Sequence, residues 1–175
     1  TSETSTAGGS NETKSDIIKS SYSEKATEDF LGAFTEEFTM TSFELTDVYM
    51  LFDDDISDLY DEMKAEIEDG GQPKQRTKAK MIGMIQKNHD DIGHVIYGKV
   101  YLGQKEIDQS TGNTKVVAQV NGEVWNIIDR RPKLVSSVSP AVFAGLGSTL
   151  DVARTNALKQ SSENSSKTII NILSN

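Results

Sequence analysis

The sequence contains no cysteine, only three prolines and one tryptophan, and far fewer basic than acidic residues. Without cysteine the chain has no disulfide bond, no thiolate nucleophile and no cysteine-based zinc site. The formal net charge of -9 and the pI of about 4.7 argue against binding to nucleic-acid phosphates or to an anionic membrane surface. No stretch approaches the roughly 18 consecutive apolar residues of a membrane span.

The chain is predicted to divide into a flexible polar tether, residues 1–22, and a single α/β domain, residues 23–175. Residues 1–15 are almost entirely Thr, Ser, Gly, Asn and Glu, so they bury too little apolar surface to offset the entropy lost on ordering. Two interpretations remain for this segment. It is either a floppy terminus or a tether that follows a removed signal peptide, as in bacterial envelope lipoproteins whose lipidated cysteine is not in this sequence.

The second half of the chain, from His94 to Leu173, has the clearest pattern. Alternating apolar residues predict strands at His94–Leu102, Lys115–Asp129 and Leu134–Ala144. Short polar turns join these strands, which predicts an antiparallel meander. The last segment, Ser148–Leu173, is predicted to be a helix that folds back across one face of the sheet.

The first half predicts three helices and one more strand. Ser23–Thr35, Asp53–Asp69 and a segment from about Lys74 to Asn88 have helical periodicity. Phe38–Leu51 alternates and is predicted to be a strand with a bend near residues 41–42. Gly83 lies among the inward residues of its helix, which suggests that a neighbouring element approaches closely there.

These elements predict an α/β fold of the α+β type. Its two layers would be a mostly antiparallel sheet and helices packed on one face, in the order strand, helix, strand, strand, strand, helix.

Two polar clusters invite a metal interpretation. The first contains the aspartates Asp53, Asp54, Asp55 and Asp58, and the second contains His89, Asp90, Asp91 and His94. A calcium loop needs a glycine for its sharp turn and a late bidentate glutamate, and the first cluster has no glycine. Capping and interaction with the positive helix N-terminus explain these aspartates more simply. Zinc binding by the second cluster would need four side chains to converge from one turn, whereas solvated turn residues need no such arrangement. We therefore expect no metal, no cofactor and no catalytic group, and hence no enzyme.

Other features indicate contacts with protein partners. Arg130, Arg131 and Lys133 form a basic turn in an acidic chain, as either a solvated turn or an electropositive knob that meets an acidic face of a neighbouring subunit. The lone Trp125 is expected in the core or in an interface. The last helix has an inward stripe whose middle consists of small residues, which suggests close packing and possible assembly. The candidate interface residues are Arg130, Arg131, Lys133, Trp125, Asp54, Asp55, Asp58, Ala153, Ala157 and Ser161.

Three segments carry a resemblance to bacterial envelope proteins. The resemblance lies in the helix-to-strand passage "AKMIGMIQKN" followed by "GHVIYGKVYLG" (Gly93–Gly103), in the run "VVAQVNGEVWNIIDRRPKLVSSVSP" (Val116–Pro140) and in the closing "FAGLGSTLDVARTNALKQSSENSSKTIINIL" (Phe143–Leu173). The families are the curli secretion channels, the flagellar outer-membrane-associated lipoproteins and the lipoprotein activators of penicillin-binding proteins, with a TolB N-terminal-like α/β domain. In those families the turn commonly carries Thr-Gly-Glu, whereas Arg-Arg-Pro-Lys stands here.

The resemblance implies a non-enzymatic structural or assembly protein of the cell envelope. It would be a periplasmic, outer-membrane-tethered subunit of a homo-oligomeric ring or disk in a flagellar basal body or a secretion machine, anchored by a lipid outside this sequence. The alternatives are a monomeric lipoprotein that activates a cell-wall synthase and, third, a metal-dependent hydrolase.

Overall fold

The computed structural model describes residues 24–51, 57–68 and 73–175. The elements in chain order are α2 (Glu24–Thr39), the short 3-10 helix η1 (Val48–Met50), α3 (Ser57–Glu68), α4 (Gln75–Asn88), β1 (His94–Leu102), β2 (Glu106–Ile107), β3 (Thr114–Asn126), β4 (Lys133–Gly147) and α5 (Leu150–Ser174). None of the described helices is both long and apolar enough to cross a membrane.

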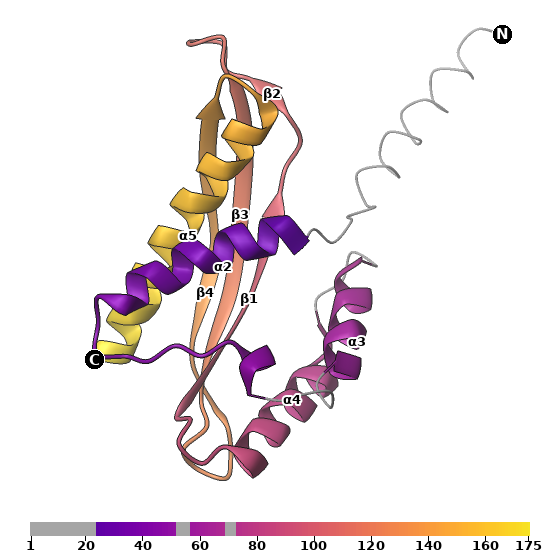
Figure 1. The fold of residues 1–175 in the computed structure, drawn as a ribbon, viewed down its shortest axis with the longest axis vertical. Helices are drawn as coiled ribbons and strands as arrows, with labels where there is room; N and C mark the ends of the chain where they lie inside the picture. The colour runs from indigo at the N-terminus through magenta and orange to yellow at the C-terminus, as the bar shows by residue number, and fades with distance from the viewer. Residues whose placement is uncertain (1–23, 52–56, 69–72) are drawn as a thin grey trace, which may run out of the picture.

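Strand β3 lies in the middle of the sheet. It pairs antiparallel with β1 along one side and with β4 along the other, while the short β2 pairs with the first residues of β3. Figure 1 shows β1, β3 and β4 running side by side through the length of the molecule. The predicted antiparallel meander and the mixed α/β class are confirmed.

Helices α5 and α2 cover one face of this sheet. Val116 and Ala118 of β3 are fully buried against Ala153 and Ala157 of α5. Further along, α2 lies across both α5 and the sheet, and its phenylalanines pack with Val124 and with the second half of α5. This layer is the helical cover that the alternation of the strands predicts.

Helices α3 and α4 lie against the other face, near the start of β1. Their buried residues pack with Val95, Tyr97 and Trp125, whereas Ile96 and Val124 belong to the cluster beneath α2. Successive residues of a strand point to opposite faces, so the two helix pairs sit on opposite sides of the sheet. Figure 1 shows α5 and the α3–α4 pair on either side of the strands. The expectation that the helices pack on one face of the sheet therefore holds for α2 and α5 but not for α3 and α4, because Val95, Tyr97 and Trp125 make the other face apolar as well.

The small residues of α5 allow the helix to lie very close to β4. Thr149 caps the helix by accepting a hydrogen bond from the backbone N–H of Val152. The predicted inward stripe holds, since the side chains from Ala153 to Ile169 at this spacing are buried. The buried serines are largely satisfied within the helix or by α2; the Ser162 hydroxyl donates to the Phe30 carbonyl at 2.6 Å.

Two features of the first half differ from the prediction. Phe38–Leu51 is not a strand: α2 continues to Thr39, a turn follows, and residues 43–47 run without a strand partner among the described residues before η1. The reason is that Phe38 continues a helical spacing of four, and its ring stacks on Phe34 at 5.2 Å between centroids. Gly83 is exposed, and a Cβ placed there would meet no atom within 4 Å, so it marks no close approach.

The expected tether and the aspartates Asp53, Asp54 and Asp55 fall outside the described residues.

Candidate interaction surfaces

The basic turn lies between β3 and β4. Arg130, Arg131 and Lys133 are all exposed. Lys133 donates to the Asp129 carboxylate at 2.8 Å, which lowers the pKa of Asp129 and raises that of Lys133. Gln86 of α4 donates to the carbonyls of Ile127 and Asp129, so the turn is attached to the end of α4. The structure thus presents the two arginines on an anchored turn.

Trp125 belongs to a polar cluster between α4 and the sheet. Its Nε1 donates to the Glu123 carboxylate at 2.9 Å, and the same carboxylate accepts from the Lys78 ammonium at 3.0 and 3.2 Å. The Lys78 ammonium also lies 5.4 Å from the centroid of the Tyr97 ring. Burial and the negative charge of Glu123 raise the pKa of Tyr97 well above its usual value. This cluster attaches α4 to the sheet, so the indole N–H of Trp125 is used inside the domain.

Three of the predicted interface residues are buried inside the domain. Ala153, Ala157 and Ser161 have no exposed surface, because they face the sheet beneath α5. The small-residue stripe therefore accounts for close packing within one molecule, and it offers no contact to a second one. The sequence could not separate these two uses, since both need small side chains at the same spacing.

The polar clusters considered for metals have other surroundings. Asp58 lies exposed in the first turn of α3, where it faces the positive end of the helix. The His89 ring is hydrogen-bonded to the Leu51 carbonyl at 2.9 Å, and His94 is an exposed residue at the start of β1. Within residues 24–51, 57–68 and 73–175, no three His, Asp or Glu side chains are grouped as a metal ion requires.

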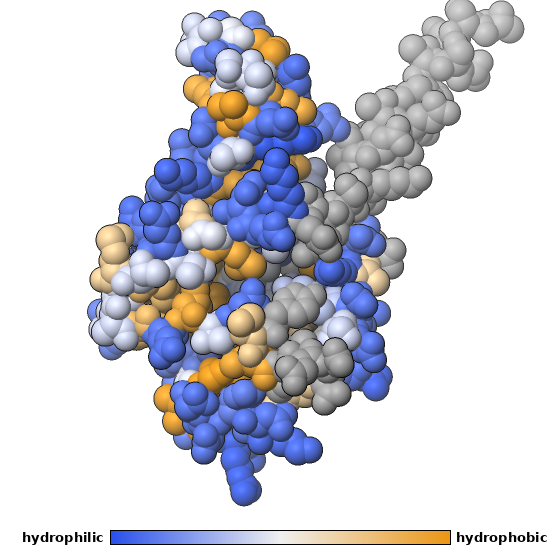
Figure 2. Space-filling model, in the orientation of Figure 1, coloured by the Kyte–Doolittle hydropathy of each residue, from blue (hydrophilic) through white to orange (hydrophobic). Residues whose placement is uncertain are grey.

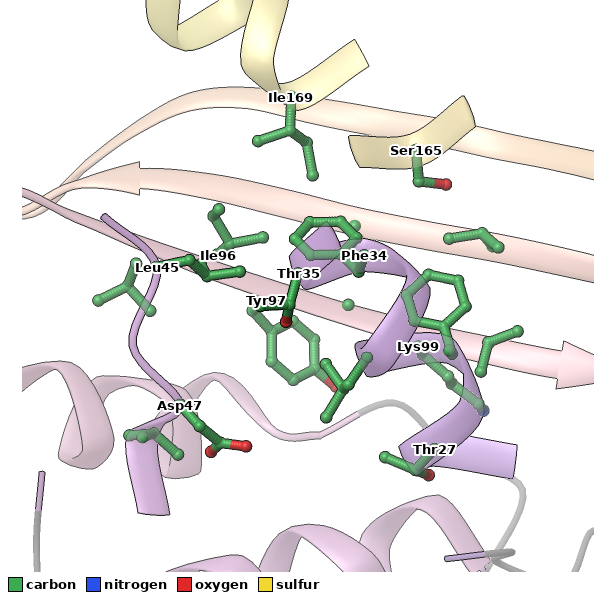
Figure 3. A pocket seen from close by; sticks show the side chains of 18 of the residues that line it. Thr27, Phe34, Thr35, Leu45, Asp47, Ile96, Tyr97, Lys99, Ser165 and Ile169 are labelled. Atoms are coloured by element: carbon green, nitrogen blue, oxygen red, sulfur yellow. The ribbon is translucent and has the colours of Figure 1, made fainter. Parts of the chain in front are cut away.

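A large apolar groove follows the outer side of β1. Its volume is about 1320 Å3, and its walls come from α2, residues 42–51, β1 and α5, with parts of α3 and α4. Figure 3 shows Phe34, Ile96 and Ile169 on its apolar side, with the polar Thr27 and Lys99 toward one end. Hydrophobic side chains also reach the surface below α2 in Figure 2. The hydroxyl of Ser165, which lines the groove, is buried and has no hydrogen-bond partner among the described residues. The groove could accept an apolar chain segment or a small apolar molecule.

The outer edge of β4 is a second surface, which the sequence analysis did not single out. No strand of the described chain pairs with this edge. From Leu134 to Gly147 the strand contains no charged residue, and Leu134, Val135, Val142 and Leu146 are exposed. The uncharged run of residues is visible in the sequence. The sequence does not show that this strand lies at the edge of the sheet.

The turn between β2 and β3 is built around one carboxylate. Asp108 accepts hydrogen bonds from the backbone N–H groups and the hydroxyls of Ser110 and Thr111. These bonds favour the ionised form and lower the pKa of Asp108 to about 2. All four donors meet one carboxylate oxygen, Oδ1, so this carboxylate holds the turn together.

Searches for related proteins found no matching family model, no similar curated protein and no similar solved structure. The features that bear on function are therefore the groove, the β4 edge and the basic turn.

Proposed function

We propose that this chain is a non-enzymatic assembly subunit that works by binding other protein chains. The observation that carries the proposal is the outer edge of β4, a fifteen-residue strand with no charge between Leu134 and Gly147. Exposed edges are templates for pairing with another chain, and proteins that do not use them usually block them with charged side chains. Pro140 interrupts this edge, and in a chain with 26% charged residues the uncharged part beyond it, residues 141–147, fits a surface that a partner covers.

The resemblance to envelope lipoproteins supports the setting of this role. We propose a periplasmic, outer-membrane-associated protein in a ring or disk of a flagellar or secretion machine. Cell fractionation of the native host with an antibody against the chain tests the location. Recovery in the cytoplasmic fraction would contradict the setting and leave the assembly role intact.

The basic turn supports a further contact between subunits. Arg130 and Arg131 are exposed on one tip of the molecule, and the acidic side chains Asp58 and Asp61 are exposed on α3. Rings require two different complementary patches because their contacts are heterologous. A basic tip and an acidic helix face provide such a pair.

Charge reversal tests this contact. We expect R130E/R131E to reduce the mass of the assembly in sedimentation velocity at low salt, since the attraction between exposed charges is screened by added salt. The control K105E/K159E makes the same change in net charge at exposed positions away from the turn. An R130E/R131E protein that assembles like the control at equal salt would show that the turn is merely solvated.

The groove along β1 supports a second candidate function. A monomeric binding module, such as an activator of a cell-wall synthase, would need a pocket for a segment of its partner, and the groove is large and mostly apolar. The two functions differ in the state of the purified chain. An assembly subunit sediments well above 19.2 kDa at concentrations up to several hundred micromolar, whereas an activator remains at that monomer mass.

A further inference from the structure

We propose that the partner of the β4 edge is β4 of a second copy. The two strands would pair antiparallel over Ala141–Gly147, with a two-fold axis at Ala144. This inference rests on the proposed assembly function and specifies the contact through which assembly begins.

The sequence of β4 sets the limits of the paired segment. Pro140 precedes it, and because proline has no N–H it cannot donate to a neighbouring strand. Gly147 is the last residue of β4 before the turn into α5. The segment between these limits has Ala144 at its midpoint, so two copies that pair antiparallel over its whole length place Ala144 opposite its own equivalent.

The ladder shows which backbone groups of this segment are free. The N–H of Gly103 donates to the carbonyl of Val117, so the odd-numbered residues of this part of β3 point their backbone groups toward β1. The even-numbered residues then point toward β4, where Val116 and Ala118 face Gly145 and Phe143. It follows that the backbone groups of Val142, Ala144 and Leu146 point away from the sheet.

A hydrogen bond from α5 agrees with this direction. Asn156 Nδ2 donates to the Leu146 carbonyl at 2.7 Å, so a side chain and not a strand of the described chain is the partner found at this carbonyl. A carbonyl oxygen has two lone pairs, so Leu146 retains one for a second donor. In the proposed register, the three outward-pointing residues of one copy lie opposite the three outward-pointing residues of the other. Val142 of one copy faces Leu146 of the other, Ala144 faces Ala144, and each such pair can exchange two backbone hydrogen bonds.

The side chains favour a copy of this chain as the occupant. Those of Val142, Ala144 and Leu146 lie on the face of the sheet opposite α5, and Val142 and Leu146 are 63% and 38% exposed. The proposed register places these two apolar side chains directly opposite each other, with the small alanine between the two pairs. Since like charges opposite one another destabilise strand pairing, an uncharged segment is where two copies with a net charge of -9 can meet.

Cross-linking tests the position of the two-fold axis. The chain has no cysteine, so a single A144C substitution introduces one thiol per molecule. Residues opposite each other in a hydrogen-bonded antiparallel pair have Cα atoms about 5.5 Å apart, within the range that a disulfide spans. The matched control is S148C, which is also exposed. Its two copies would be roughly 27 Å apart along the paired strands, given about 3.4 Å per residue. We expect mild oxidation to convert A144C, but not S148C, to a covalent dimer.

Charge pairing tests the register independently. V142K and L146E each place a charge opposite an apolar side chain, and each should weaken dimerisation about tenfold or more. The double variant V142K/L146E places opposite charges across both pairs of the same register, so it should recover dimerisation toward that of the unmodified chain. Circular dichroism of all variants checks that the domain still folds.

The outcomes separate this inference from the proposed function. If the unmodified chain assembles but A144C cross-links no better than S148C and the double variant is as weak as the single ones, the β4 pairing is refuted and the assembly function stands. If the unmodified chain is a monomer at several hundred micromolar, both are refuted. Selective cross-linking together with recovery in the double variant supports the proposed register.

Discussion

Gly145 is the glycine of β4 at which an added Cβ would clash most severely with α5. A Cβ added to Gly145 would fall against the backbone carbonyl of Ala153 and the backbone N of Ala157, and it would lie 2.8 Å from the Cα of Ala157. These atoms belong to the helix backbone, so no side-chain rotation can remove the clash. G145A therefore forces α5 away from β4.

The cost of this shift can be estimated. Overpacking of a core costs typically 1–3 kcal/mol, and a backbone obstacle places G145A near the upper end, at about 3 kcal/mol. Replacing glycine also reduces the entropy of the unfolded chain, which returns about 0.4–1 kcal/mol. The net loss is then about 2 kcal/mol. For a chain of this length that corresponds to a fall in Tm of roughly 4–8 °C.

Thermal and urea denaturation of G145A measure this loss, and G83A is the matched control. Gly83 lies exposed in α4, where a Cβ meets nothing within 4 Å. Alanine there should raise stability by about 0.5–1 kcal/mol through helix propensity. A G145A protein with an unchanged or higher Tm would refute the argument that the small residues of α5 exist for close packing on β4.

Two further predictions concern polar groups inside one molecule. K78M removes the main partner of the Glu123 carboxylate. This carboxylate is about one-quarter exposed and keeps the Trp125 donor, so we expect the free energy of unfolding, measured by urea denaturation, to fall by about 1–3 kcal/mol. K78M/E123Q should recover part of it, and no recovery would show that the loss came from packing alone. The pKa of Asp108 is about 2 in the folded chain, below its ordinary 3.8. Its contribution is therefore present above about pH 4 and is lost as the pH falls toward 2. D108N should flatten the fall of the urea midpoint over this range, and an unchanged pH profile would contradict the turn geometry.

The strands and the last helix could be predicted from the sequence because their burial follows local periodicity. Along β3 alternate residues such as Val116, Ala118 and Val120 are buried, and along α5 the residues from Ala153 to Ile169 are buried at helical spacing. A strand that is covered on one face must alternate, and a helix that packs on it must repeat about every 3.6 residues. These patterns determined the meander and its helical cover.

The end of α2 shows where periodicity alone was insufficient. Phe38 and Phe43 fit an alternating strand as well as they fit a helix end followed by an extended segment. The choice depended on whether Phe38 could stack on Phe34 and bury itself against Val124 and Ile169. The stacking on Phe34 is a local contact at helical spacing, but the burial against Val124 and Ile169 involves distant residues that no local pattern contains.

The functional surfaces, too, could be predicted from the sequence only in part. The sequence by itself determined that there are no thiols, that the chain is acidic and that a basic turn separates two strands. Only the tertiary structure decided that Trp125 and the small residues of α5 are used internally, and that β4 lies at an edge with its outer backbone groups unpaired by any described strand. The physical reason is that composition and spacing fix the chemistry of a side chain. Whether a neighbour already covers that side chain depends on how distant segments pack together.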